Sequence, residues 1–302
     1  MRLRQTAPTR PEPEATSLLG KPLFRPPLAD AARARLEADL AAAWDKARSE
    51  PSADAIIWLG RRNAYLGRFR EAIQAFTGGL RLYPDDARFY RHRGHRHITV
   101  RDFDRAIADL DRAAALIKGQ PDEVEPDGQP NARNVPLSTL HTNIWYHLAL
   151  ARYLKAGYAR SASDWTRARD AGKNADNLVS ASHWLYTTLR RAGRRDEAAA
   201  VLTPIRASLE VIENTSYHSL LLLYKGERTE ADVLKAAGEG AAGTAVRYGV
   251  SAWHLANGRQ SEATKLWDAI LAQPDWPSFG YIAAEADTAR SRGAGPRLPA
   301  FA

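Results

Sequence analysis

The sequence predicts an all-α solenoid, a chain of stacked helix pairs. Three observations support this prediction. Apolar residues recur with helical spacing along most of the 302 residues, Gly or Pro separates the helical segments, and the same arrangement returns at intervals of roughly 32 to 37 residues. Each segment has an apolar face that it cannot bury alone, so neighbouring segments are expected to pack against one another.

The start of the chain differs from the rest. Residues 1–29 are rich in proline and show no helical period, so we expect an extended or disordered tether there. A helix is expected over residues 30–50, with Asp30 as its N-cap. Its apolar residues recur every four positions, at Leu36, Leu40 and Trp44.

Comparison of the chain with itself reveals the repeat. In residues 53–86, Gly60 lies in a first helix, Gly67 in a turn and Phe76 in a second helix, which Pro84 follows. Small residues let two antiparallel helices approach closely, and large ones fill the gap between neighbouring pairs. About 34 residues later, the corresponding places of a second copy hold Gly94, Phe103, Ala106, Leu110 and Ala113. Four further copies are marked by Trp145, Leu148, Ala149, Tyr158, Trp165 and Ala168; by Leu185, Gly193, Ala198, Leu202 and Ile205; by Tyr217, Leu221, Gly226, Ala231 and Leu234; and by Val250, Ser251, Gly258, Ala263, Trp267 and Ile270.

These copies resemble the tetratricopeptide repeat, and the resemblance covers roughly residues 53–275. The fold of that family implies a right-handed superhelix of about six helix pairs. A terminal helix is expected as well, because the outer face of the last pair has no neighbour. The expected segments are two pairs over 53–118, an insertion over 119–141, four pairs over 142–275, a capping helix over 276–292 and a tail over 293–302.

Composition limits the functions that this chain can have. It contains no cysteine, which excludes disulfides, thiolate nucleophiles and thiolate zinc sites. No apolar run approaches the roughly 18 residues of a membrane span, and the N-terminal segment lacks the apolar centre of a secretory leader. We therefore expect a cytoplasmic protein, or alternatively an exported one whose leader has been removed. The abundance of Arg favours a bacterial source.

Nucleic acid is not an expected partner. The net charge of +8 is spread along the chain rather than concentrated in a basic block or helix stripe. Tryptophans recur at repeat-like intervals, which is typical of packing residues in a superhelix rather than of a stacking platform for bases. These tryptophans are Trp58, Trp145, Trp165, Trp184, Trp253 and Trp267.

No catalytic or cofactor motif appears in the sequence. It lacks a nucleotide-binding glycine loop, a nucleophile elbow, an EF-hand and the two helical zinc-protease motifs. We therefore expect a protein that is not an enzyme and that has no cofactor.

Two features depart from the repeat. Arg93 occupies a helix-packing position that is leucine in the sister copies, and His97 follows one turn later. An unpaired buried charge is costly, so Arg93 needs solvent or an anion. The insertion carries four carboxylates, which are Asp122, Glu123, Glu125 and Asp127. Because long loops in compact arrays are often functional, we expect the insertion to fold back so that its carboxylates pair with Arg93, His92 or His97.

Three interpretations of this polar site remain open. The insertion could be a structural plug that satisfies the polar helix, or part of a binding site for a partner or a small anion. The third interpretation is a metal site that uses His92, His95 or His97. Spacing argues against metal, because His92 and His95 can share a helix face whereas His97 points elsewhere.

The resemblance also implies where a partner binds, since the first helix of each pair lines the concave face in that family. By helical phase, this lining would include Ile57, Arg61, Tyr65, Arg88, Arg91, His95, Asn143, Tyr146, Leu150 and Tyr153. Arg offers a bidentate fork for acidic or C-terminal carboxylate groups, and Tyr adds rigid contact area. Members that bind chaperone tails use a clamp of Lys, Asn and Arg, which is largely absent here, so such tails are not expected.

The sequence therefore predicts a scaffold or adaptor that binds a partner protein or peptide, with acidic or carboxylate groups, on its concave face. The residues expected to contact the partner are Arg61, Tyr65, Arg88, Arg91, His95, Tyr146 and Tyr153. The alternative is a ligand-, metal- or substrate-binding module, with or without enzymatic activity, built from the polar helix of the second copy and the insertion.

Overall fold

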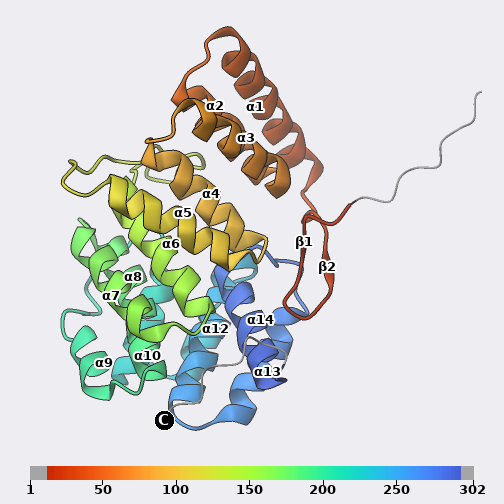
Figure 1. Cartoon of the computed structure of the whole chain (residues 1–302). Helices are drawn as coiled ribbons and strands as arrows, with labels where there is room; N and C mark the ends of the chain where they lie inside the picture. Colours follow the sequence, from red (N-terminus) through yellow and green to blue (C-terminus); the bar gives the residue numbers. More distant parts are fainter. Residues whose placement is uncertain (1–11, 294–302) are drawn as a thin grey trace, which may run out of the picture.

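The computed structural model describes residues 12–293, which form fourteen helices and one short hairpin (Figure 1). The first helix, α1 (Asp30–Ser49), precedes six helix pairs, and α14 (Phe279–Ser291) follows them. The pairs are α2 (Ala53–Tyr65) with α3 (Phe69–Leu82), α4 (Ala87–Thr99) with α5 (Phe103–Leu116), α6 (Leu140–Leu154) with α7 (Tyr158–Ala171), α8 (Ala175–Arg191) with α9 (Arg195–Val201), α10 (Thr215–Lys225) with α11 (Glu230–Ala236), and α12 (Gly240–Ala256) with α13 (Gln260–Leu271).

The helices stack in chain order, which confirms the predicted all-α solenoid (Figure 1). In the first three pairs, each second helix packs against the first helix of the next pair. After α8 the order changes slightly, because α9 is short and α10 packs directly on α8. None of the helices in residues 12–293 combines the length and the apolar composition that a bilayer crossing requires.

Local sequence explains where the helices begin. Ser52 caps α2 by accepting a hydrogen bond from the Ala55 backbone, and Asp102 caps α5 in the same way. At the start of α6, Thr139 and Thr142 form a reciprocal capping box. These caps satisfy backbone N–H groups that the first turn of a helix leaves free, so the starts of α2, α5 and α6 are defined by their own sequences.

Small residues let the paired helices touch, as the repeat pattern predicts. A Cβ atom added to Gly60 would lie 2.3 Å from the Phe76 ring, and one added to Gly94 would lie 2.7 Å from Leu110. These distances are well below van der Waals contact, so the large side chain of one helix fills the space that the glycine of its partner leaves. The small and large residues that recur in the sequence therefore mark contacts between the two helices of a pair.

The tryptophans at repeat-like intervals belong to this packing. Trp165, Trp184 and Trp267 are buried. The remaining three are partly exposed, and each lies 4.2 to 4.9 Å beneath an arginine guanidinium, in the pairs Trp58 with Arg61, Trp145 with Arg167, and Trp253 with Arg259.

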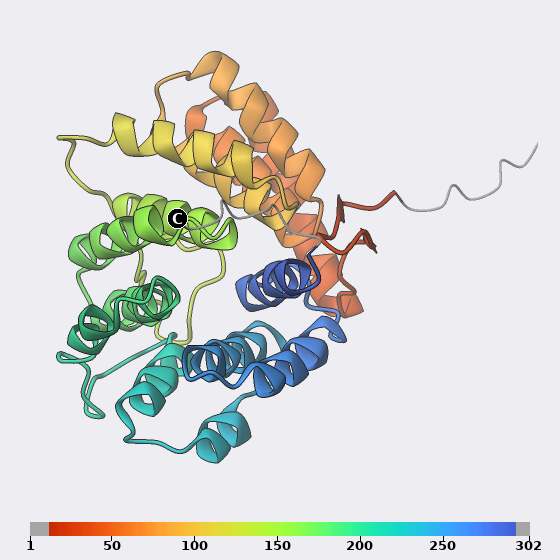
Figure 2. The ribbon, with the colours of Figure 1, turned by 60° about the horizontal axis from the view of Figure 1, so that its bottom comes forward.

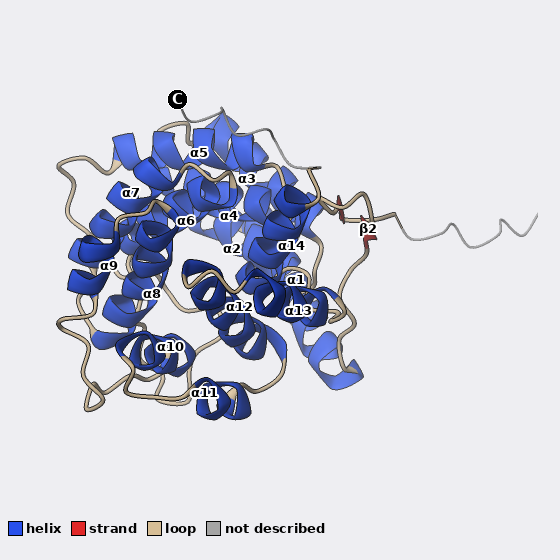
Figure 3. Ribbon diagram, turned by 90° about the horizontal axis from the view of Figure 1, so that it is seen from below, coloured by secondary structure: helices blue, strands red, loops and turns tan. Residues whose placement is uncertain are grey.

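The last helix lies inside the curve of the array (Figures 2 and 3). It packs against α12 and α13, as a cap would, but it also reaches α6. Residues 280–289 are all buried. The sequence predicts a cap on one end, whereas the structure shows a central helix that fills much of the concave side.

The two ends of the described chain meet beside α14. The indole of Trp276 donates a hydrogen bond to the Phe24 carbonyl (2.7 Å) and meets the Phe69 ring edge-on, with 5.4 Å between ring centroids. Arg101, in the turn between α4 and α5, forms a buried ion pair with Glu285 (2.8 Å). The array therefore closes on itself.

The expectation of a free tether is wrong for residues 12–29. Two short strands, β1 (Ala15–Thr16) and β2 (Pro22–Leu23), pair antiparallel, and the buried Glu14 carboxylate accepts a hydrogen bond from Arg25 Nε (2.6 Å). Proline prevents a helix here but does not prevent strand pairing at an edge. Residues 1–11 of the expected tether and residues 294–302 of the expected tail lie outside the described residues.

One expected core position of α1 is also wrong. Leu36 and Leu40 are buried, but Trp44 is 51% exposed. The reason is that α1 packs on α2 alone among the described helices, so its apolar face is covered only in part.

Candidate functional site

The concave side of the array contains two adjoining cavities. The concave pocket, about 400 Å³, lies between the insertion, α6, α8, the start of α10 and the start of α14. The arginine cavity, about 130 Å³, lies between α2, α3, α4 and the insertion. Three residues, Arg91, His95 and Glu125, line both cavities and therefore form the wall between them.

Three arginines converge on the arginine cavity. Arg61 comes from α2, and Arg91 and Arg96 come from α4. Arg91 Nε lies 2.9 Å from Glu125 Oε2, and Arg61 donates a hydrogen bond to the Pro126 carbonyl (2.8 Å). Within residues 12–293, Glu125 is the only carboxylate at ion-pair distance from any of the three guanidinium groups.

The pKa values of these arginines reflect the excess of guanidinium groups over carboxylates. Burial, followed by repulsion from Arg91, lowers the pKa of Arg96. Burial also lowers the pKa of Arg91, against the attraction of Glu125, which raises it, and Arg61 adds a smaller repulsion. Both guanidinium groups keep their charge in water-poor surroundings, so the site favours an additional anion.

Three histidines beside the arginines are neutral at physiological pH. Burial is the main cause that lowers the pKa of His92, His95 and His147 well below the usual value, and the nearby arginines lower it further. The rings of His95 and His147 lie 4.2 Å apart, and Phe279 of α14 lies 5.3 Å from His95. These rings give the concave pocket an aromatic side wall that adds no charge.

The insertion is anchored at its base and folds over α2 and α4. Its two ends pair through a bridge between Val124 and Thr139, and Glu125 N donates a hydrogen bond to the Ser138 carbonyl (3.0 Å). This anchor places the Glu125 carboxylate against Arg91, 3.8 Å from His92 Nε2, where it also accepts a hydrogen bond from Asn143 (3.0 Å). The insertion therefore folds back onto the repeats, and of its four carboxylates Glu125 is the one that reaches Arg91 and His92.

The structure brings many of the predicted residues together around the two cavities. His95 and Glu125 line both of them, as noted for Arg91. The other predicted residues that line one cavity or the other are Arg61, Tyr65, His92, Asp127 and Tyr146.

The predicted pairing of Arg93 and His97 with the insertion is wrong. Arg93 forms a bidentate ion pair with Asp109 of α5 (2.7 and 2.8 Å), and His97 lies 3.8 Å from the same carboxylate. These side chains point from α4 toward its own second helix, so Arg93 is satisfied within the repeat. The insertion's Asp122 instead accepts a hydrogen bond from His141 N, and the exposed Glu123 uses its backbone carbonyl.

Two residues predicted to contact a partner are engaged elsewhere. Arg88 binds Asp86 and Asp54 at the edge of the array, each at 2.6 Å. Tyr153 is fully buried and shares a hydrogen bond with Tyr248 (2.6 Å), because α14 and α12 cover that part of α6. Leu150 is buried too, so the open part of the concave face ends near Tyr146.

The sequence analysis does not predict several of the lining residues. Arg96 and His147 lie on predicted first helices, each one position after a predicted lining residue (His95 and Tyr146), so a wider arc of the helix surface would include them. Phe279 comes from α14, and its place could not be predicted because no local signal puts a terminal helix inside the curve. Others are Asn177, Ser180, Glu213, Asn214 and Tyr217.

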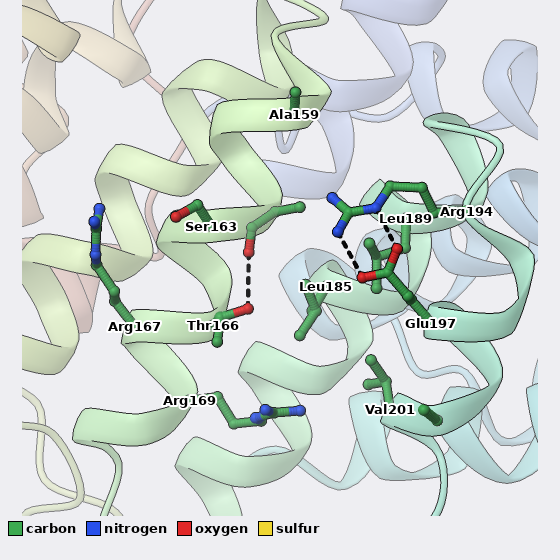
Figure 4. Close-up of a pocket in the computed structure, with 12 residues that line it drawn as sticks. Ala159, Ser163, Thr166, Arg167, Arg169, Leu185, Leu189, Arg194, Glu197 and Val201 are labelled. Atoms are coloured by element: carbon green, nitrogen blue, oxygen red, sulfur yellow. Dashed lines mark hydrogen bonds and ion pairs between the residues drawn. The ribbon is translucent and has the colours of Figure 1, made fainter.

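A second depression, the outer groove of about 660 Å³, lies between α7, α8 and α9 (Figure 4). Leu185 and Leu189 form part of its floor, and small residues of α7 form one side. On the other side Arg194 and Glu197 pair with each other. Because its charged groups pair locally and none of its lining residues is a buried polar one, this groove has fewer groups available to bind a ligand than the concave side has.

No group of three or more His, Asp or Glu side chains in residues 12–293 is arranged to hold a metal ion. On α4, His92 contacts Arg91 and His95 packs against the His147 ring.

No family model matches the chain, and no curated protein matches its sequence. The chain is similar to YrrB, described as a TPR protein with an unusual peptide-binding site, at 14% identity and a TM-score of 0.44, over 82% of this chain and 98% of that one. A tetratricopeptide repeat protein from Parabacteroides merdae is similar at 12% identity and a TM-score of 0.47, over 79% and 87% of the two chains. At these identities and TM-scores the likeness carries no argument about this chain, and its description as an array of stacked helix pairs rests on its own structure.

Proposed function

We propose that this tetratricopeptide-type array is a protein-binding scaffold that takes a carboxylate-bearing segment of its partner into the concave pocket. One observation carries the proposal: three guanidinium groups converge on a cavity where the described residues supply a single carboxylate. Guanidinium groups bind carboxylates through paired, charge-assisted hydrogen bonds, and burial strengthens such bonds. A partner's carboxylate would therefore meet guanidinium groups, Arg61 and Arg96, that have no carboxylate partner among the described residues.

The rest of the pocket suits a peptide. Tyr146 and Phe279 offer aromatic surface to a side chain. The side-chain oxygens of Asn143 and Asn214 can accept hydrogen bonds from a peptide backbone, whereas their amide nitrogens already donate within the protein. The lining is mostly polar, with Leu137 and Phe279 as its apolar residues, so charge and hydrogen bonds would hold a ligand there.

The position of α14 restricts what can enter. In an open superhelix, a partner could lie along the whole concave face. Here α14 fills the part beside α6, α8 and α12, and the insertion covers α2 and α4. We therefore propose that the ligand is a short segment, either the end of a chain or one acidic side chain with its neighbours.

A small free carboxylate is the second candidate ligand. A volume of about 400 Å³ falls within the range of small-molecule sites, roughly 300–1,000 Å³. In either case the protein acts by binding, and we assign no catalytic residue.

The proposal is tested with an array of peptides, each present with a free C-terminal carboxylate and as its C-terminal amide, with acidic residues placed at varied internal positions. We expect wild-type protein to bind peptides that carry a carboxylate, and to lose about tenfold or more in affinity when that group is neutralised. Arg96→Gln should reduce this preference, because it removes one of the three guanidinium groups.

The matched control is Arg33→Gln, at an exposed position of α1 outside both cavities. It should bind like wild type. Equal binding of acids and amides by folded wild-type protein would contradict the proposal. Binding of free small carboxylates but of no peptide would favour the second candidate.

A further inference from the structure

We propose that Glu125 is a built-in occupant of the partner's site, whose carboxylate stands where the partner's carboxylate binds and must be displaced by it. The inference rests on the proposed function and adds how the site is regulated. It follows from the position of one insertion residue among groups that belong to the repeats.

The contacts of Glu125 are those expected of a bound carboxylate. One oxygen lies 2.9 Å from Arg91 Nε and accepts a hydrogen bond from Asn143 (3.0 Å), and the other lies 3.8 Å from His92. The partners come from α4 and α6, which are first helices of neighbouring pairs. A ligand on the concave face would meet these same groups.

The carboxylate also stands at the junction of the two cavities. Glu125 and Arg91 line both, so their ion pair separates the concave pocket from the arginine cavity that Arg61 and Arg96 complete. A ligand that enters through the concave pocket reaches all three guanidinium groups only after this pair opens. The ion pair is therefore an inner gate of the site.

The side chain can leave without unfolding the insertion. The backbone of Glu125 is held by Ser138 and by the bridge between Val124 and Thr139, and neither contact involves the carboxylate. The adjacent Pro126 and Asp127 are exposed. Rotation about the side-chain bonds of Glu125, each with staggered alternatives, moves its carboxylate away from Arg91 while the loop stays in place.

Displacement makes the site selective. A neutral ligand cannot replace the charge of Glu125, so it would leave Arg91 buried without a counter-ion. A ligand carboxylate replaces that charge. Its apparent affinity is lowered because it binds only those molecules in which Glu125 has left Arg91. Glu125 thus keeps Arg91 neutralised when no partner is bound and sets the affinity when one is.

The test compares Glu125→Gln with wild type, using the carboxylate peptide that binds best on the array. The amide keeps the size of the side chain and loses the competing charge, so we expect binding about tenfold tighter than that of wild type. Glu123→Gln is the control, because Glu123 lies on the same loop, is exposed and lines neither cavity. It should bind as wild type does. Equal or weaker binding by folded Glu125→Gln protein would overturn the proposal.

A second measurement needs no partner peptide. Glu125→Ala leaves space beside Arg91, so sodium acetate should raise its Tm more than it raises that of wild type, relative to sodium chloride at equal ionic strength. An equal response of the two proteins would overturn the assignment of Glu125 as an internal ligand. The outcomes remain distinguishable: failure of the array removes the peptide function, whereas failure of the acetate test removes the internal ligand alone.

Discussion

The arginine at the closure and the arginines of the arginine cavity are balanced in different ways. Where the array closes, Arg101 meets Glu285 of α14, and the two side chains are 3% and 1% exposed. Arg101 also donates hydrogen bonds to the carbonyls of Thr99 and Trp276. In the arginine cavity, Arg61, Arg91 and Arg96 share only Glu125 among the carboxylates of residues 12–293.

We infer from this difference that the Arg101–Glu285 pair serves the fold, whereas the arginine cavity is suited to bind a ligand. At the closure, one carboxylate faces one guanidinium, and hydrogen bonds satisfy the rest, so nothing is left for a ligand to neutralise. In the arginine cavity, positive charge exceeds negative charge and two cavities adjoin the excess. Proteins tolerate such an imbalance at functional sites at some cost in stability.

The largest expected effect concerns the closure. Glu285→Gln leaves Arg101 buried without a counter-ion, so the free energy of unfolding should fall by about 3–5 kcal/mol in chemical denaturation. Asp45→Asn is the control, since the Arg48–Asp45 pair is about three-quarters exposed and should contribute less than about 1 kcal/mol. A loss for Glu285→Gln as small as that of the control would show that the closure does not hold the array together.

The next effect tests helix packing apart from both charged groups. Gly60→Ala places a Cβ 2.3 Å from the Phe76 ring, so we expect a loss of roughly 1–3 kcal/mol, measured by urea unfolding. Gly78→Ala on α3 has open space around its Cβ and should be neutral or stabilising by up to about 1 kcal/mol. The same sign for both changes would contradict the role assigned to the small residues.

A pH effect on stability is expected from His183, a buried histidine of α8. Burial lowers the pKa of His183 to about 3, so its imidazole stays neutral in the folded protein while the unfolded chain binds a proton below about pH 6.5. Stability should therefore fall as pH drops from about 6.5 toward 3, by up to about 1.4 kcal/mol per pH unit for this group. Denaturation of His183→Gln across this range should show a shallower slope, and an unchanged slope would contradict it.

The smallest effect has the opposite sign. Arg96→Met removes one of the mutually repelling guanidinium groups and keeps an apolar side chain of similar length. We expect stability to stay the same or rise by up to about 1 kcal/mol in thermal and urea unfolding. A loss comparable to that of Glu285→Gln would mean that Arg96 is satisfied in the free protein.

Whether a contact can be predicted from the sequence depends on how far apart in the chain its two residues lie. The helix pairs could be predicted because glycine and aromatic residues mark contacts within a repeat, as Gly60 and Phe76 do. The partner of Arg93 was mistaken, yet a signal existed: Arg152 of the next pair likewise binds an aspartate of its own second helix, Asp164. A rule of pairing within the repeat would have assigned Arg93 to Asp109.

The closure could not be predicted in this way. Glu285 and Arg101 are 184 residues apart, and α14 carries no repeat pattern that would place it inside the curve. Its polar residues look like a solvated helix surface until the tertiary structure supplies their partners. The composition of the concave pocket depends on the same placement, because Phe279 belongs to α14.

The central claim is that the arginine cavity holds positive charge that the protein's own carboxylates do not balance. It is tested most directly by the Tm of wild type and Arg96→Met in sodium acetate against sodium chloride at equal ionic strength. Acetate should raise the Tm of wild type and raise that of Arg96→Met much less, because the variant lacks part of the excess charge. The same response in both proteins would contradict the claim.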